Sequence, residues 1–229
     1  MFEVREITIR NQEFLDALEK YKDVLMEKVT PDGEPLVARS CPRAHATDDP
    51  NQWVSHEYMH KIINMGRGHL GFPAALGGFS GLKHEGESAG KNINIAGANR
   101  IKDASSALNS KIIQLTAARN NALNACYPPK GFIAWHNNAN ASGYNIIITW
   151  SENGDGYWEH YDIDKKEVVR IQDQPGWQAK MTYFGPYDYP DKLCYHAAYT
   201  DCYRITVAFV FAEADTFWEE VIEDIETPS

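Results

Sequence analysis

No apolar run in the sequence approaches the roughly 20 consecutive residues that a membrane-spanning helix requires. The N-terminus, from Met1 to Glu6, lacks the basic and then apolar pattern of a signal peptide. We therefore expect no membrane association. The four cysteines, at positions 41, 126, 194 and 202, show no Cys-x-x-Cys spacing, which favours free thiols in a reducing compartment. These absences together predict a cytoplasmic protein.

Basic residues are also scarce, with 22 Lys and Arg against 32 Asp and Glu and a net charge of −10. Broad, non-specific binding to phosphate backbones needs a surface rich in Lys and Arg, so the balance argues against a nucleic-acid partner, although a local basic groove stays open. The 229 residues suffice for one large domain or two small ones. Hydrophobic residues make up 43% and charged residues 24%, which is ordinary for a globular protein.

The first 128 residues have mainly helical patterns. We predict a short strand at 2–10, a helix from an Asn11 cap to about residue 29, a helix at 50–65 and a helix at 103–124 ended by Pro128-Pro129. Between the second and third helices, residues 66–90 are glycine-rich with little periodicity. Long loops of this kind are often functional.

After Pro129 the sequence changes to short runs rich in Ile, Val, Thr and aromatic residues, separated by Gly, Pro, Asn and Asp. The predicted strands are 131–136, 144–151, 157–162, 167–171, 177–184, 193–196 and 203–212. Many short strands at even spacing are typical of a jelly roll or barrel. We expect an α+β single domain over 1–229, with a helical part at 1–128 packed on one sheet, a β core at 129–212 and a last helix and tail at 213–229.

Two histidines bracket this β region. Residues two apart on a strand face the same side, so His136 and Asn138 can both point into a barrel, and His196 on a later strand can complete a three-point set. Two imidazoles and one oxygen ligand with open positions suit Fe(II) in oxygenases. The alternative for each histidine is an ordinary core or surface residue with a hydrogen-bonded partner.

Arg204 lies on the last predicted strand and shares a face with Thr206, opposite Ile205 and Val207. An arginine inside a barrel requires an anion, and its planar fork suits a carboxylate. A bound dicarboxylate would satisfy it, with the Thr206 hydroxyl adding a hydrogen bond. An internal Asp or Glu is the alternative partner.

Residues 131–212 resemble the double-stranded β-helix core of the 2-oxoglutarate/Fe(II)-dependent oxygenases. The resemblance rests on His136 with a polar residue two positions on, His196 several strands later, and Arg204 with Thr206. It covers about a third of the chain. It implies that His136, Asn138 and His196 bind Fe(II), and that Arg204 and Thr206 bind the far carboxylate of 2-oxoglutarate.

The resemblance also implies the reaction. With O2, 2-oxoglutarate would be converted to succinate and CO2 while an unidentified small molecule or protein side chain is hydroxylated, or in some relatives halogenated. We place Tyr144 and Trp150 beside the co-substrate. Asn138 departs from the family, which usually has a carboxylate there. It predicts a weak neutral ligand, a water-orienting residue, or a jelly-roll binding protein without catalysis.

Two other patterns contain possible metal ligands. His160-Tyr161-Asp162 is a literal His-x-Asp, but it leaves few strands before His196, and Asp162 is also a candidate third ligand from a neighbouring strand. His56-Glu57-x-x-His60 falls on a predicted helix and matches the zinc-peptidase pattern, with His69 or His84 as further ligands. A zinc hydrolase is therefore a second reading.

Overall fold

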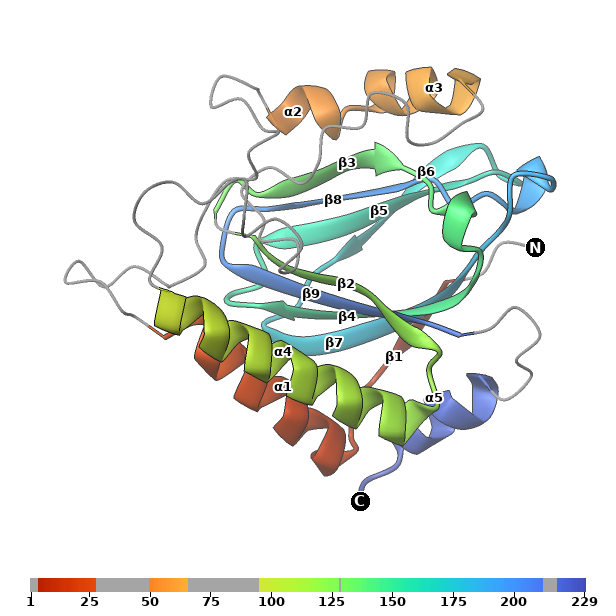
Figure 1. The fold of residues 1–229 in the computed structure, drawn as a ribbon. Coiled ribbons are helices and arrows are strands. Elements are labelled where there is room, and N and C mark those ends of the chain that lie inside the picture. The colour runs from red at the N-terminus through yellow and green to blue at the C-terminus, as the bar shows by residue number, and fades with distance from the viewer. Residues whose placement is uncertain (1–3, 28–49, 66–94, 128, 212–217) are drawn as a thin grey trace.

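The computed structural model describes residues 4–27, 50–65, 95–127, 129–211 and 218–229. Two sheets in the described part face each other (Figure 1). The first is five-stranded, in the order β1 (Val4–Ile7), β7 (Gly176–Phe184), β4 (Gly143–Ser151), β9 (Arg204–Val210) and β2 (Asn120–Tyr127). The second is four-stranded, in the order β3 (Phe132–His136), β8 (His196–Thr200), β5 (Gly156–Asp162) and β6 (Glu167–Gln172).

The chain passes repeatedly between these sheets. β2, β4, β7 and β9 lie in one, while β3, β5, β6 and β8 lie in the other, and every pairing is antiparallel. This interleaved order is that of a double-stranded β-helix, so the predicted fold class is confirmed. β1 and β2 come from the part predicted to be mainly helical, and they extend the five-stranded sheet at both edges.

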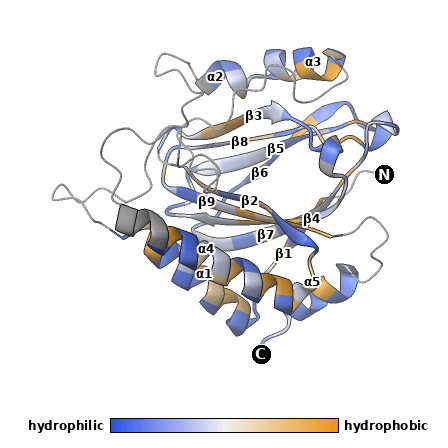
Figure 2. Ribbon diagram, in the orientation of Figure 1, coloured by the Kyte–Doolittle hydropathy of each residue, from blue (hydrophilic) through white to orange (hydrophobic). Residues whose placement is uncertain are grey.

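Helices cover the outer faces of both sheets (Figure 1). α1 (Gln12–Leu25), α4 (Ile95–Thr116) and α5 (Trp218–Glu226) share one apolar core with the five-stranded sheet. α2 (Pro50–Trp53) and α3 (His56–Met65) pack on β3 of the other sheet instead. α1 and α4 carry hydrophobic and hydrophilic residues side by side, as expected of helices buried along one face (Figure 2). None of the described helices has the length and apolar character to cross a membrane.

Strict alternation along the strands decides what lies between the sheets. On β9, Ile205, Val207 and Phe209 face the helices, so Arg204 and Thr206 face inward. On β7, Ala179 and Met181 likewise belong to the helix-side core. An interior apolar cluster lies between the two sheets and contains Ile147, Trp158, Phe184, Cys194 and Ala198. The described cysteines, 126, 194 and 202, are buried and free, as predicted.

The helix predicted at 103–124 differs most from the structure. α4 runs from Ile95 to Thr116, and β2 occupies Asn120–Tyr127. The helix ends at Ala117, which adopts a φ of 53° and donates its backbone N–H to the carbonyl of Ile113. Such turns usually show a glycine, and an alanine there gives no signal in the sequence.

Two further boundaries shift. The helix predicted at 50–65 is divided into α2 and α3, because the Ser55 hydroxyl accepts the N–H of Tyr58 and caps a new helix. The strand predicted at 193–196 is β8, which begins at His196 and runs to Thr200. The glycine-rich segment at 66–90, with His69 and His84, lies outside the described residues.

Candidate functional site

The structure brings His136 and His196 together. His136 ends β3, His196 begins β8, and the two are direct partners in the antiparallel register. Their ring centroids are 4.2 Å apart with the ring planes inclined by 53°. Both side chains are buried, at 3% and 5% exposure. Pairing of β3 with β8 therefore brings these two histidines together, although they are 60 residues apart in the sequence.

Backbone carbonyls fix the orientation of both imidazoles. His136 Nδ1 lies 2.8 Å from the carbonyl oxygen of Ala134, and His196 Nδ1 lies 3.0 Å from that of Cys194. A carbonyl can only accept, so each Nδ1 carries the proton and each Nε2 holds the lone pair in the neutral ring. Metal-bound histidines are typically held in this way. The pair thus has the donor chemistry that a divalent transition metal requires.

The third ligand position is less well defined. Asn138 lies beyond the end of β3, next to a short 3₁₀ helix at Ala139–Ala141, so the two-residue strand spacing does not apply to it. His160 on β5 is the register partner of His196 on β8. Burial lowers the pKa of the His160 imidazole to about 4. Within the described residues, however, no three His, Cys, Asp or Glu side chains are grouped to hold a metal.

Asp162 lies at the β5–β6 turn. Its Oδ1 accepts the backbone N–H of Lys165 at 3.0 Å, and its Oδ2 lies 3.3 Å from Lys165 Nζ. The main-chain hydrogen bond from Lys165 is the largest of the effects that lower the pKa of this carboxyl. The carboxylate of the literal His-x-Asp pattern is therefore already engaged at the turn.

The prediction that Tyr144 and Trp150 line the co-substrate pocket is wrong. Both pack against the helix-side core, outside the barrel. The Tyr144 ring stacks on Trp218 of α5 at 4.7 Å, and Lys22 Nζ of α1 lies 5.8 Å from the Trp150 ring. On β4 the odd-numbered residues face inward, because Ile146 and Ile148 belong to the helix-side core.

The His-Glu-x-x-His pattern lies on α3, as predicted, but on its outer face. His56, Glu57 and His60 are exposed, while Met59 and Ile62 on the same helix are buried against the four-stranded sheet. The proposed further ligands, His69 and His84, lie outside the described residues. Nothing in the described part brings a third ligand to this pair.

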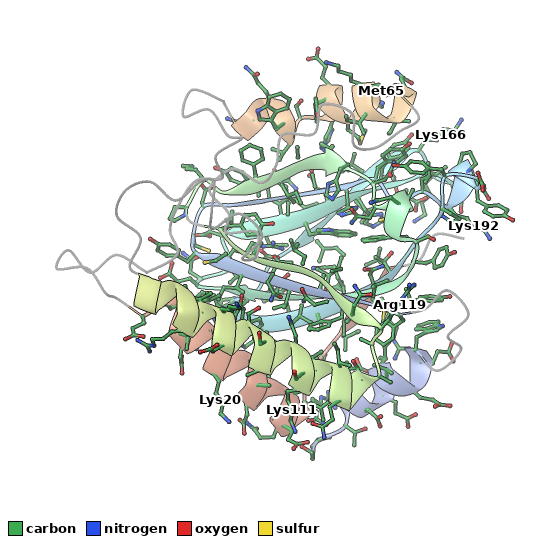
Figure 3. The ribbon with its side chains drawn as sticks, in the orientation of Figure 1. Lys20, Met65, Lys111, Arg119, Lys166 and Lys192 are labelled. Atoms are coloured by element: carbon green, nitrogen blue, oxygen red, sulfur yellow. The ribbon has the colours of Figure 1, made fainter. Side chains whose placement is uncertain are left out.

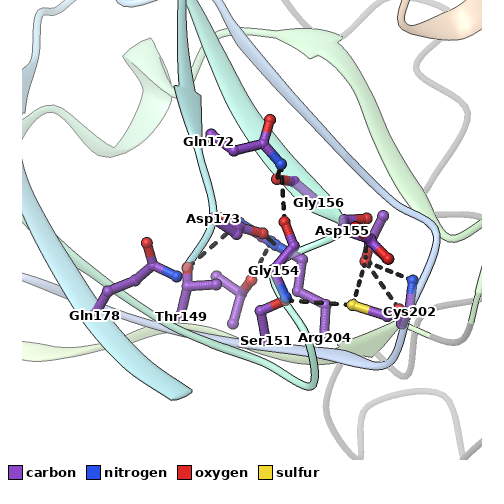
Figure 4. A network of polar contacts seen from close by, with 12 residues as sticks. Thr149, Ser151, Gly154, Asp155, Gly156, Gln172, Asp173, Gln178, Cys202 and Arg204 are labelled. Carbon is purple, nitrogen blue, oxygen red and sulfur yellow. Dashed lines mark hydrogen bonds and ion pairs between the residues drawn. The ribbon is translucent and has the colours of Figure 1, made fainter. Parts of the chain in front are cut away.

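Arg204 has an internal carboxylate partner, the second of the two alternatives that its sequence position allows. Its Nε lies 2.7 Å from Asp173 Oδ2 and its Nη2 lies 3.4 Å from Oδ1 (Figure 4). Two hydroxyls complete the contacts, since Nη1 donates to Thr206 Oγ1 at 2.6 Å and Nη2 donates to Thr149 Oγ1 at 3.3 Å. Both charged side chains are buried, at 2% and 0% exposure.

A glycine makes room for this ion pair. Asp173 follows β6, and its backbone N–H donates to the carbonyl of Gly156 at 2.8 Å. A Cβ at position 156 would lie 2.6 Å from Asp173 Oδ2 and 3.0 Å from Thr200 Oγ1. The sequence analysis did not identify Asp173. Its position directly after a strand is the only sequence feature that could have indicated it.

Lys180 on β7 is the second buried cation, also missed from the sequence. It is 1% exposed, and its Nζ has no hydrogen-bond partner among the described residues. Its Nζ lies 5.5 Å from the centroid of the Trp158 ring, on the opposite sheet. Burial, followed by the charge of Arg204, lowers the pKa of Lys180 to about 8, against the opposing influence of Asp173 and Glu6.

The sequence matches no known protein family and no curated protein. Among solved structures, a prolyl-4-hydroxylase from Pseudomonas putida is similar over 69% of this chain and 84% of its own, with 12% identity and a TM-score of 0.34. The structure of OsALKBH1 is similar over 70% of this chain and 94% of its own, with 11% identity and a TM-score of 0.31. No residue role is transferred from either.

The ion pair predicts an asymmetric response to mutation. Asp173→Asn leaves the Arg204 charge buried without its counter-charge, which typically costs about 3–5 kcal/mol. Asp201→Asn removes a similar ion pair with Lys130, but both of those side chains are exposed, so the expected loss is below about 1 kcal/mol. Urea denaturation of the two variants measures the difference. Equal losses would contradict the buried pairing.

Lys180 predicts a pH-dependent stability difference. The pKa of Lys180 is about 8 in the folded protein, against an ordinary value of 10.5. Between these two pH values the unfolded chain binds more protons than the folded chain, so the free energy of unfolding rises with pH across this window. At pH 7 the free energy of unfolding of Lys180→Met should exceed that of wild type by roughly 3 kcal/mol, because the variant has no buried ammonium. The gap should close as pH approaches 10.5.

The control is Lys192→Met, at an exposed position on the periphery (Figure 3). It should match wild type at pH 7. Chemical denaturation at several pH values reports all three proteins. A Lys180→Met variant that is less stable than wild type at pH 7 would mean that the ammonium has a stabilising partner.

Proposed function

We propose that this protein is an Fe(II)- and 2-oxoglutarate-dependent dioxygenase that hydroxylates a small molecule or protein side chain. One observation carries the proposal: two buried histidines from different strands adjoin inside a double-stranded β-helix, each with its Nδ1 held by a backbone carbonyl. Imidazole suits Fe(II), and a site with two protein nitrogens leaves positions open for a co-substrate and O2. His136 and His196 are the proposed ligands, with Asn138 or water third.

The chain's own residues bind and orient the reactants. His136 and His196 hold the metal through Nε2, and the carbonyls of Ala134 and Cys194 keep both rings in that tautomer. Fe(II) bound there would supply the redox chemistry by which O2 gives one oxygen atom to succinate, formed from 2-oxoglutarate with loss of CO2, and the other to a C–H bond of the substrate. The burial of both rings excludes bulk water from one side of the site.

The co-substrate needs a cation at its far carboxylate. In the described part of the chain the barrel interior contains two, Arg204 and Lys180. Arg204 with Thr206 follows the family pattern, and in the proposed enzyme these residues lie on the inward face of β9. A carboxylate that bound Arg204 by a two-point contact would have to displace Asp173 or a threonine hydroxyl from its guanidinium.

A second candidate function is a non-catalytic barrel that binds an acid. Asn138 in place of a carboxylate and the Asp173–Arg204 pair both favour it. Iron-dependent formation of succinate from 2-oxoglutarate separates the two functions, because a binding protein produces none. Assays with and without Fe(II), with O2 present, give the answer even without the primary substrate, provided that uncoupled turnover occurs.

Metal binding tests the histidine pair. His136→Ala and His196→Ala should each abolish saturable binding of Mn(II) or Co(II), because one imidazole alone makes a weak site. The controls are His56→Ala and His60→Ala, at exposed positions on α3, which should bind as wild type. Calorimetry measures affinity, and circular dichroism checks the fold. Loss in the controls with retention in the other two variants would move the metal to α3 and favour the zinc hydrolase.

Asn138 predicts a response to an added carboxylate. Asn138→Asp supplies a charged oxygen ligand two residues after His136 and should strengthen Fe(II) binding by about tenfold or more, as expected of a two-histidine, one-carboxylate set. Asn138→Ala should retain the weaker binding of two histidines. Anaerobic Fe(II) titrations compare the three proteins. Identical affinities would show that residue 138 does not contact the metal.

A further inference from the structure

Buried charge in the barrel is not balanced. Within the described residues the buried charged side chains are Glu159, Asp162, Asp173, Lys180 and Arg204. Glu159 pairs with Arg170, Asp162 pairs with Lys165, and Asp173 pairs with Arg204. Lys180 alone of these five has, among the described residues, no opposite charge within ion-pair distance and no hydrogen bond to its Nζ. A lone buried charge costs several kcal/mol.

The groups around Lys180 do not compensate it. The indole of Trp158 provides a cation–π contact, but its partial negative charge is much smaller than that of a carboxylate. Glu6 is its neighbour in register on the edge strand β1, but Glu6 is exposed and makes no hydrogen bond to it. Arg204 adds repulsion, and the carboxylate of Asp173 is held by that arginine.

The Trp158 ring connects Lys180 with the proposed metal site. Its Nζ is 5.5 Å from the centroid of the Trp158 ring, and the same ring lies 5.7 Å from the ring of His196. Lys180 comes from the five-stranded sheet, whereas Trp158 and His196 come from the four-stranded sheet. One side chain therefore contacts both the ammonium and a proposed iron ligand, which places the two in the same part of the barrel interior.

We infer that Lys180, and not Arg204, receives the far carboxylate of the acid co-substrate, an inference that rests on the proposed function. Arg204 already donates to both oxygens of Asp173 and to two threonine hydroxyls, so four of its five N–H donors are engaged and no second two-point contact with a carboxylate is open. A ligand that displaced Asp173 would bury an unpaired carboxylate and gain nothing in charge balance. A ligand on Lys180 neutralises a cation that has no ion-pair partner in the part of the chain that the structure describes.

The experiment compares two acids on oxygen-free, Mn(II)-loaded protein. 2-Oxoglutarate and 2-oxopentanoate have the same chain length and the same metal-binding end, but only the first has a second carboxylate. The ratio of their affinities therefore measures the far-carboxylate contact alone. For wild type we expect a preference for 2-oxoglutarate of about 10–100-fold, the equivalent of one charged hydrogen bond.

Lys180→Met should reduce this preference to within about twofold while leaving the affinity for 2-oxopentanoate unchanged. Lys180→Gln is a second variant with a polar but neutral side chain and should behave in the same way. Lys192→Met, at the exposed position, and Asp173→Asn, which leaves Lys180 in place, should both keep the preference.

Each other outcome has a distinct meaning. A full preference in both Lys180 variants would overturn the inference, and stronger 2-oxoglutarate binding by Asp173→Asn would then identify Arg204 as the receptor. A wild-type protein that binds metal but neither acid would remove the co-substrate assignment and the role of Lys180 together. Failure to bind metal would instead refute the proposed function at the histidines.

A second readout does not depend on affinity. The ¹³Cε resonance of a labelled lysine reports its protonation, and Lys180→Met assigns the signal. Arg204, Asp173 and Glu6 are the charged groups that act on Lys180, and the free ammonium should titrate near pH 8. Saturating 2-oxoglutarate should raise that midpoint by about one unit or more, whereas 2-oxopentanoate should not. Equal shifts with both acids would contradict the contact.

Discussion

Charge neutralisation between two closely packed sheets is the constraint on which this structure depends. The strands β4, β7 and β9 are covered on one face by helices and on the other by the second sheet, so neither face meets bulk water. On these strands the apolar side chains mostly face the helices, and the polar side chains face the barrel interior. Arg204 must therefore find a carboxylate, and Asp173 provides it from the end of β6. Gly156, on the neighbouring strand, leaves space for that carboxylate.

The sequence predicts the strands well because their alternation and turn residues are local. The inward position of Arg204 and Thr206 follows from the apolar residues beside them. The meeting of His136 with His196 was expected from their places on two predicted strands and from the resemblance. Asp173 and Lys180 could not be found in this way. In an ordinary sheet with one solvated face, the Lys180 side of β7 would point to water, and only closure by the second sheet buries it.

The wrong prediction for Tyr144 and Trp150 also arose because the sequence of one strand does not show which of its faces lies inside the barrel. β4 has bulky residues at even positions and Asn145, Thr149 and Ser151 at odd positions, so the aromatic side resembles a pocket lining. In the structure the helices pack on that apolar side, and the smaller polar residues line the barrel.

The strand β2 was missed for a different reason. Its residues continue the apolar spacing of α4, and the turn that separates them uses Ala117 at a positive φ, without a glycine.

In the proposed site Asn138 and Lys180 have the same electrostatic effect, because both leave positive charge uncompensated. Two neutral imidazoles and an amide or water leave the full charge of a divalent metal uncompensated, whereas the usual carboxylate would offset part of it. Lys180 leaves a further positive charge at the other end of the same interior. A diacid carries one negative charge for each end. In this barrel the co-substrate would therefore supply counter-charges that the described residues do not. The energy released at both ends would offset the stability that a buried lysine without an ion-pair partner among those residues costs the folded chain.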